Sequence, residues 1–596
     1  MIKDFLLNRI KIVLKDMGMD ENCANISFSQ MQNLADFQTS APFVLAKMAK
    51  QPPFEMAQKL AKKLNEDEHL KMFEISASNP GFVNFKFTDK GISAFANELF
   101  ADKERIGIER VKQPKNIILD YGGANVAKEL HMGHLRSPII GESIKRLNRF
   151  FGNTCVADTH LGDWGLQMGL TIAELEEQGL LDFYFKPSTN AKKPNITLDL
   201  LNEMYPKASA KSKVDDTFKK KADDYTLFLQ QKRSPFYEIW QEIRKVSVGK
   251  IEQNYKDLNA EFDLWYGEST ANPYIANTLQ IFKDKNLLKE SNGALVVEVA
   301  REGEHIPIPK QSEDEVQRYI NPMPPAVIQK HNGGELYITT DLATIYQRMK
   351  DFPQTNEIVY ITDARQATHF EQVFRCARLA GLVNDDVKLV HVGFGTMNGK
   401  DGKPFKTRNG GMIKLDDVVN LLKEKANDKL AQNGVPDFND LARKIGVAAM
   451  KFGDLSNQVS KDYVLDIDKF LAFEGKTGPY LQYTATRIKS LLHKANYDAK
   501  NNNLISCKLD EEHDIVMNII KLQDALVQAL NENSFHMVCV AVFNLCSAYS
   551  CFYNNIRILT EKDEAKKQSY LNLSYLTYCA IKIGLDVLAI DIPDKM

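Results

Sequence analysis

Residues 116–134 have the sequence NIILDYGGANVAKELHMGH, and this stretch decides the fold. Residues 117–119 are apolar at consecutive positions, which is typical of a strand buried on both faces of a parallel sheet. Gly122 and Gly123 predict a tight loop after that strand, and a helical pattern follows over residues 133–151. A strand, a glycine loop and a helix in this order predict the first unit of a Rossmann-like α/β domain.

Two histidines, His131 and His134, stand at the start of that helix and are three residues apart. This spacing places both rings on one side of the first turn, where the helix N-terminus adds partial positive charge. Gly133 between them lets a ligand approach the backbone closely. Alone, the pattern more often belongs to loop histidines that bond to water or backbone. After a strand and a glycine loop, it favours a site for nucleotide phosphates.

The chain has 596 residues, a net charge of −2 and an ordinary globular composition, with 44% hydrophobic and 26% charged residues. This composition excludes collagen-like, mucin-like and mostly disordered proteins. The near-zero charge means that an RNA site must be a local patch. The eight cysteines form no Cys-x-x-Cys or zinc-finger spacing, so we expect reduced, buried thiols at positions 23, 155, 376, 507, 539, 546, 551 and 579.

Further along the chain, the pattern predicts several domains. The first 16 residues predict an amphipathic helix and not a secretion signal, and the charged segment 102–113 predicts a linker. Residues 183–245 are polar, lysine-rich and helical, which indicates an insertion. Helices are expected from about residue 415 to the end. Strands are expected at 81–87, 294–299, 326–329, 336–339, 357–362 and 388–392.

The least polar long stretch is Met537–Tyr553. It is too short to span a bilayer comfortably and contains Asn544, so we interpret it as a buried helix. The sequence therefore predicts a cytoplasmic protein with no membrane partner.

Residues 124–137, ANVAKELHMGHLRS, resemble the "HIGH" signature of class I aminoacyl-tRNA synthetases, in the form found in the arginyl-tRNA synthetase family. Further segments resemble the same family in the same order. They are HLGDWG at 160–165, YITTDLA at 337–343, DARQ at 363–366 with HF at 369–370, FGTM at 394–397, KPFKTR at 403–408, FEG at 473–475 with YLQY at 480–483, and IPDKM at 592–596.

The resemblance implies a Rossmann-like parallel-sheet catalytic domain over 111–450, with an insertion at about 183–290. It also implies an N-terminal α/β domain over 1–110 that contacts the tRNA elbow, and a C-terminal all-α bundle over 451–596 that binds the anticodon. The implied enzyme is an arginine–tRNA ligase, which activates L-arginine with ATP and transfers it to the 3′-terminal adenosine of tRNA(Arg). Mg²⁺ is expected with ATP, zinc is not, and a monomer is the family's usual state.

For ATP, the resemblance implies contacts from His131, Gly133 and His134, and from the basic loop residues Lys406 and Arg408. Thr407 replaces the second lysine of the usual Lys-Met-Ser-Lys-Ser loop. The resemblance implies that Lys128 supplies the missing charge, so His131, His134 and Lys128 are the expected catalytic residues. No protein nucleophile is required, because positioning and charge stabilisation suffice.

For arginine, a planar guanidinium requires carboxylates in its plane. Asp120 and Asp341 are each expected at the end of a strand, and both would then lie at the carboxyl edge of the sheet. The resemblance assigns the guanidinium to Asp120, Tyr337 and Asp341, and the α-amino and carboxylate end to Asn125 and Gln366. Residues 122–124 are Gly-Gly-Ala where the family usually has serines and a proline.

For tRNA, the resemblance implies that Phe37 and Gln38 contact the elbow and that Tyr480, Tyr483, Tyr553 and Met596 contact the anticodon. Without the resemblance, aromatic residues at helical spacing are core residues. Two other functions remain open. One is a paralogue that adenylates arginine or another amine-bearing acid for a small acceptor, which the complete C-terminal bundle disfavours. The other is an inactive RNA-binding relative, which the intact histidines and Lys128 disfavour.

Overall fold

The computed structural model describes residues 1–31, 33–186, 192–301, 303–304, 306–307, 319–320, 322–329, 336–399, 402, 414–432, 439–472, 474–500 and 504–596. These residues form two compact units. One is Val111–Asp468, and the other combines Met1–Arg110 with Lys469–Met596. The predicted domain boundaries, after residues 110 and 450, stay predictions. Helix α15 (Asn439–Leu455) runs through residue 451 and lies in the unit Val111–Asp468.

The unit Val111–Asp468 is built on a four-stranded parallel sheet with the order β13-β12-β5-β6. The chain enters this sheet at β5. It next forms β6 on one side of β5, and later β12 and β13 on the other side. The strand order therefore reverses between β5 and β12, and ligands of such sheets bind at the carboxyl ends of the strands at this point. The predicted Rossmann-like sheet is confirmed. Its strands are β5 (Asn116–Asp120), β6 (Thr154–Asp158), β12 (Glu357–Asp363) and β13 (Lys388–Phe394).

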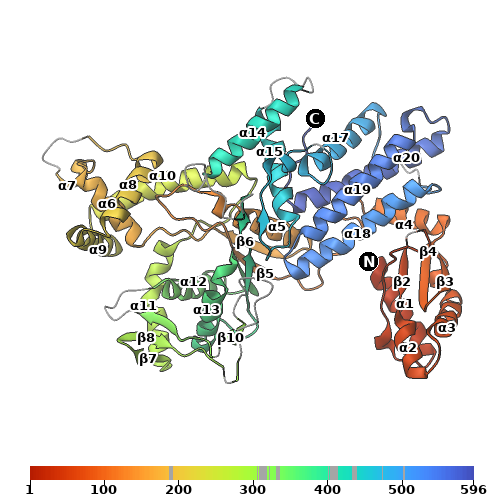
Figure 1. The fold of residues 1–596 in the computed structure, drawn as a ribbon, viewed down its shortest axis with the longest axis horizontal. Helices are drawn as coiled ribbons and strands as arrows, with labels where there is room; N and C mark the ends of the chain where they lie inside the picture. The colour runs from red at the N-terminus through yellow and green to blue at the C-terminus, as the bar shows by residue number, and fades with distance from the viewer. Residues whose placement is uncertain are drawn as a thin grey trace. The chain divides into compact units, whose positions relative to one another are not determined.

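Successive residues of a strand point to opposite faces of the sheet, and helices pack on its apolar side chains. Helix α5 (Arg136–Phe150) contacts β5, β6 and β12. A buried cluster joins Ile118, Ile358 and Tyr360 of the sheet to α11 (Glu268–Asp284), α12 (Tyr337–Asp351) and α13 (Ala367–Ala380). Figure 1 shows α12 and α13 next to each other, to the left of β5.

The predicted strand at 336–339 is wrong, because helix α12 begins at Tyr337. The β-branched run Ile338-Thr339-Thr340 favours a strand locally. Ile338, Leu342 and Ile345 are buried at positions i, i+4 and i+7, so burial of one helical face overrides that local preference. The other predicted strands lie within a residue or two of observed ones.

Residues 166–257 form a lobe of helices, labelled α6 to α10 at the left of Figure 1; the insertion predicted at about 183–290 covers α8, α9 and α10 of this lobe and extends through α11. The helices are α6 (Leu166–Glu177), α7 (Asp182–Phe185), α8 (Leu198–Lys211), α9 (Asp216–Gln230) and α10 (Phe236–Asp257). A three-stranded antiparallel sheet follows, with β7 (Leu288–Ser291), β8 (Ala294–Val297) and β11 (Ala326–Gln329). The unit also contains the pairs β9 (Ile306–Pro307) with β10 (Tyr319–Ile320) and β14 (Met397–Asn398) with β15 (Tyr463–Val464), and helix α14 (Leu415–Gln432). Helix α16 spans Ile467–Phe470.

The N-terminal part of the other unit is an antiparallel sheet with the order β1-β2-β4-β3 and four helices, as the predicted α/β domain requires. The predicted amphipathic helix is α1 (Ile2–Asp16), which buries Leu6, Ile10 and Leu14. The other elements are β1 (Ser27–Phe28), β2 (Phe37–Thr39), α2 (Ala41–Ala49), α3 (Pro53–Asn65), β3 (Phe73–Ser78), β4 (Phe82–Phe87) and α4 (Asp89–Ala101).

The C-terminal part of this unit is a bundle of four helices, as predicted. They are α17 (Gly478–Lys494), α18 (Asp510–Glu532), α19 (His536–Asn555) and α20 (Glu564–Val587). In the part of the chain that the structure describes, only α19 is long and apolar enough to cross a membrane. It packs against α18 and α20 and buries Val538, Leu545 and Phe552, so it is a core helix of the bundle.

All eight cysteines lie within the described residues, and none forms a disulfide. Five are buried, as predicted, at 155, 376, 507, 539 and 546. Cys23 and Cys579 are half-buried and Cys551 is exposed, so for these three the prediction of burial does not hold.

Candidate active site

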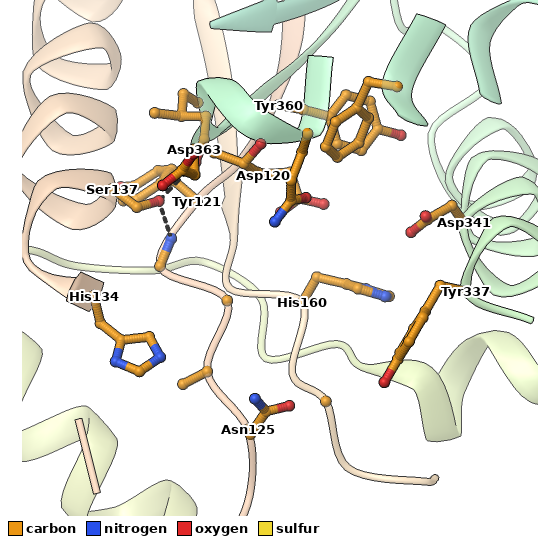
Figure 2. A pocket seen from close by; sticks show the side chains of 18 of the residues that line it. Asp120, Tyr121, Asn125, His134, Ser137, His160, Tyr337, Asp341, Tyr360 and Asp363 are labelled. Atoms are coloured by element: carbon orange, nitrogen blue, oxygen red, sulfur yellow. Dashed lines mark hydrogen bonds between the residues drawn. The ribbon is translucent and has the colours of Figure 1, made fainter. Parts of the chain in front are cut away.

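A cavity of about 570 Å³ lies at the carboxyl ends of β5 and β12, where the strand order reverses (Figure 2). Figure 2 shows His134 on one side of it and Tyr337 and Asp341 of α12 on the other. The cavity therefore brings together side chains that are more than 200 residues apart in the sequence. Of the predicted site residues, it is lined by Asp120, Asn125, Gly133, His134, Tyr337, Asp341 and Gln366.

The two histidines hold each other at the start of helix α5. The Nδ1 atom of His131 accepts from the backbone N–H of Gly133 at 3.1 Å, and the Nδ1 atom of His134 accepts from the N–H of His131 at 3.2 Å. The ring centres are 3.9 Å apart. Because both Nδ1 atoms accept, each neutral imidazole carries its proton on Nε2. Each ring can therefore donate a hydrogen bond to a ligand from its Nε2–H group.

The electrostatics keep these rings neutral. Burial lowers the pKa of His134 to about 4, with a smaller contribution from His131. Burial, followed by the charge of Lys128, lowers the pKa of His131. Both rings are therefore uncharged donors near pH 7, which suits phosphate oxygens without requiring a proton to be taken up.

Two glycines of the loop have steric reasons for being glycine. A Cβ atom on Gly133 would lie 2.9 Å from Cε1 of His131. Gly122 has a φ of +71°, and a Cβ atom there would lie 2.9 Å from the ring of Phe262. Residues 122–124 differ from the usual pattern of the family. At Gly122, aromatic rings occupy the space that a side chain would need.

Helix α12 carries a polar row toward the cavity, formed by Tyr337, Asp341, Thr344 and Arg348. These residues follow the i, i+4, i+7, i+11 spacing of one helical face. Asp341 was expected at the end of a strand, and that expectation is wrong. It lies in the second turn of α12, and it still lines the cavity because the helix directs this face to the sheet edge.

Asp120 ends β5 as predicted, but it already has a cationic partner. Its Oδ2 accepts from Nη2 of Arg348 at 2.7 Å, and the same nitrogen donates to Oδ2 of Asp158 at 2.6 Å. Arg348 is fully buried. Burial opposes its charge, but Asp120 and Asp158 raise the pKa of Arg348 well above its usual value, so it stays protonated. The structure therefore favours Asp341 over Asp120 as the carboxylate for a substrate cation.

The sequence analysis missed several polar residues of the cavity, among them His369, Glu268 and His160. His369 places Nε2 2.6 Å from Oδ2 of Asp341, and this contact orients the carboxylate. Glu268 begins α11, and burial raises the pKa of its carboxyl group. His160 follows β6. His160 and His369 lie in the quoted motifs, which could have signalled them, but no motif contains Glu268.

The third predicted catalytic residue, Lys128, lines a second cavity of about 530 Å³. This cavity shares Asn125, Glu268 and Tyr337 with the first, so the two are neighbours. The predicted loop residues Lys406 and Arg408 lie outside the described residues.

In the bundle, two of the three predicted tyrosines, Tyr483 and Tyr553, contact the guanidinium of Arg487, and the third, Tyr480, is linked to it through Ser550. The guanidinium carbon of Arg487 lies 5.5 Å from the ring centre of Tyr483 and 4.7 Å from that of Tyr553. The hydroxyl of Tyr480 and Nη2 of Arg487 both contact Oγ of Ser550, at 3.1 and 2.7 Å. The predicted residues thus form one cluster on α17 and α19. Met596 is half-buried at the chain end.

The predicted contact of Phe37 with tRNA does not fit this structure. Phe37 is fully buried in β2, and its ring centre lies 5.5 Å from that of Phe28. Alternation along β2 points Phe37 and Thr39 into the core and leaves Gln38 half-buried. Phe37 therefore cannot stack on an RNA base in this conformation. Gln38 stays a prediction.

The comparisons with known proteins agree along the whole chain. The family described as "tRNA synthetases class I (R), catalytic domain" matches residues 96–467. The "DALR anticodon binding domain" matches 481–596, and the "Arginyl tRNA synthetase N terminal domain" matches 4–87.

Two curated relatives are each named arginine–tRNA ligase. The one from Agathobacter rectalis is 41% identical over 97% of both chains. The one from Alkaliphilus oremlandii is 38% identical over 100% of both. Among solved structures, the arginyl-tRNA synthetase of Plasmodium falciparum has a TM-score of 0.78 at 24% identity and covers 100% of this chain and 99% of its own. That of Thermus thermophilus has a TM-score of 0.77 at 20% identity, with full coverage of both. These two likenesses show the fold.

Three matched domains in order, full-length relatives and the nucleotide-type cavity lead to one assignment: the chain belongs to the arginyl-tRNA synthetase family of the class I tRNA synthetases.

Proposed function

We propose that this chain is an arginine–tRNA ligase that works in two steps. First, a carboxylate oxygen of L-arginine attacks the α-phosphorus of ATP, the bond to the β-phosphate breaks, and arginyl-adenylate and diphosphate form. Then a ribose hydroxyl of the 3′-terminal adenosine of tRNA(Arg) attacks the arginyl carbonyl carbon. AMP leaves, and the hydroxyl proton passes to solvent. The names of the full-length relatives support this activity.

One observation carries the proposal at the level of residues. A single cavity has the neutral imidazole of His134 on its α5 side, with the ring of His131 3.9 Å behind it, and the carboxylate of Asp341 on its α12 side (Figure 2). The first group suits a polyphosphate and the second suits a guanidinium. An enzyme that joins ATP to arginine requires both in one chamber.

On the phosphate side, His131 and His134 donate their Nε2–H groups to oxygens where negative charge develops. Lys128 adds a positive charge beside them, in place of the missing second lysine of the basic loop. Lys406 and Arg408 are proposed to hold the leaving diphosphate. The chain acts here by positioning and by charge, with no covalent bond to the protein.

On the arginine side, Asp341 accepts from the planar guanidinium and Tyr337 covers it from one turn earlier on α12. Glu268, half-buried close to this end of the cavity, is a second acceptor. Asn125 and Gln366 are proposed for the α-amino and carboxylate groups. Lysine binds poorly to such a site, because its single ammonium leaves oriented acceptors without partners.

Mg²⁺ is proposed to enter as the complex with ATP. Within the described ranges, no group of three His, Cys, Asp or Glu side chains could hold a metal ion. Mg²⁺ keeps several waters and binds mainly through substrate phosphates at nucleotide sites, so it needs no cage of protein ligands. We assign no residue to it.

We propose that tRNA is contacted by Gln38, Tyr480, Tyr483, Tyr553 and Met596. Phe37 is not included, because it is buried. Aromatic rings on the bundle suit unstacked anticodon bases. We further propose, from the resemblance to the family, that the enzyme acts as a monomer in the cytoplasm.

The test is tRNA charging with each of the twenty amino acids, together with pyrophosphate exchange with and without tRNA. We expect esterification of arginine alone, and exchange only when tRNA is present. Exchange without transfer would indicate the small-acceptor paralogue, and the absence of both reactions would indicate an inactive relative.

A further inference from the structure

The backbone on both sides of Lys128 is held by helices of the inserted lobe. The N–H of Ala127 donates to Oγ of Ser247 on α10 at 3.1 Å. The N–H of Glu129 donates to Oδ1 of Asn202 on α8 at 3.1 Å. Ala127 is buried with a φ of +64°, a left-handed conformation that residues other than glycine rarely adopt. The lobe therefore holds a tight turn directly before Lys128.

The side chain of Lys128 meets the same lobe. Its Nζ lies 4.4 Å from the ring centre of Tyr205, which follows Asn202 by three residues on one face of α8. Tyr205 packs on a buried apolar cluster that contains Leu170 and Phe218, so its ring is fixed. A lysine side chain has several rotatable bonds, and an aromatic face in this position limits where its ammonium lies.

The opposite side of the loop is also held. The carboxylate of Glu129 pairs with Nζ of Lys414 at 2.6 Å, and the carbonyl of Leu130 accepts from the N–H of Leu415 at 2.9 Å. The loop that carries Lys128 thus lies between the inserted lobe and the start of α14.

We propose that Asn202, Tyr205 and Ser247 are positioning residues of the inserted lobe, which hold Lys128 where its ammonium meets the phosphates of ATP. Asn202 and Ser247 fix the backbone of the loop, and Tyr205 fixes the ammonium. The inference rests on the proposed function, because it takes the role of Lys128 from there. The lobe is then part of the activation machinery.

The test is a double-mutant cycle on tRNA-supported pyrophosphate exchange, with Y205L, Y205F, K128A and Y205L/K128A. We expect Y205L to lower kcat about fivefold, within the range of a cation–π contact, with KM for ATP and arginine unchanged. Y205F keeps the ring and should restore wild-type kcat. In the K128A background, Y205L should change kcat by less than about twofold, because the contact is already gone.

A second pair of variants tests the backbone contact. N202A should lower kcat in the same way. E203Q is the matched control, because the neighbouring Glu203 pairs with Lys207 at the exposed surface of the same helix. Thermal unfolding of each variant separates loss of the fold from loss of positioning, and N202A keeps the test decisive if Y205L does not fold.

The outcomes are distinct. If K128A lowers kcat while Y205L and N202A behave as wild type, the inference is overturned and the proposed function stands. Equal losses from Y205L with and without Lys128 would also overturn it, because Tyr205 would then be structural. An unchanged rate in K128A would remove the proposed role of Lys128 and the inference with it.

Discussion

The change Asp341→Asn removes one negative charge from the arginine side of the cavity and preserves the shape of the side chain. In the structure, Oδ2 of Asp341 is taken by His369, so Oδ1 remains for the substrate guanidinium. We expect a large effect on arginine, because the bond is between charged groups. We expect little effect on ATP, because the histidine pair proposed to bind the phosphates is unchanged.

The magnitude follows from the burial of Asp341. A hydrogen bond to a charged group contributes about 1.5–3 kcal/mol to binding. The side chain of Asp341 is 23% exposed, so solvent screens part of the attraction and the lower half of that range applies. A loss of about 2 kcal/mol corresponds to an increase of about 30-fold in KM for arginine.

The assay is the initial rate of tRNA charging, with arginine and ATP varied separately. The matched control is D351N, at the far end of the same helix, where Asp351 accepts from the hydroxyl of Tyr266 outside the cavity. We expect no change in either KM for this control. Equal increases in both KM values for D341N, or an arginine effect of the same size for D351N, would refute the assignment.

Four further predictions test other parts of the account. R348M leaves two buried carboxylates without their cation, so the free energy of unfolding in urea should fall by about 3–5 kcal/mol; a value equal to wild type would show that the pair is not needed. Burial, with a smaller effect of His369, lowers the pKa of His391 to about 4, whereas an unfolded histidine titrates near 6.5. The unfolded state therefore binds the proton first and stability is lost as the pH falls from about 6.5 to 4; H391N should flatten this slope in thermal unfolding, and an unchanged slope would argue against it. Y483A should raise KM for tRNA by about 5- to 100-fold, the loss of one stacked base, and leave KM for arginine unchanged; a change in KM for arginine alone would contradict this. F37A should lower the free energy of unfolding by about 3–5 kcal/mol because it empties a core position, whereas a stable variant with weaker tRNA binding would restore its RNA role.

The parallel sheet and the histidine pair could be predicted from local sequence. A strand buried on both faces is continuously apolar, as at 117–119, and the glycine loop and helix follow within 20 residues. The roles of His131 and His134 depend on their spacing and on the helix start, which are also local features. These parts could be predicted without information about residues far away in the sequence.

Other parts depend on contacts between distant residues and have no local signal. Asp120 meets Arg348 across 228 positions, and only the folded chain shows that this aspartate is already paired. The strand at 336–339 was predicted from its β-branched residues. The i, i+4 spacing of Tyr337 and Asp341 indicates the helix that the structure shows. Phe37 carries an aromatic ring as a base-stacking residue would, but strand alternation buries it.

The most direct measurement of the central claim is a crystal structure with L-arginine and a non-hydrolysable ATP analogue. The account predicts that the guanidinium lies within hydrogen-bond distance of Asp341, at about 3 Å, with the triphosphate against Nε2 of His131 and His134. A guanidinium bound away from Asp341, or a triphosphate away from both imidazoles, would contradict it.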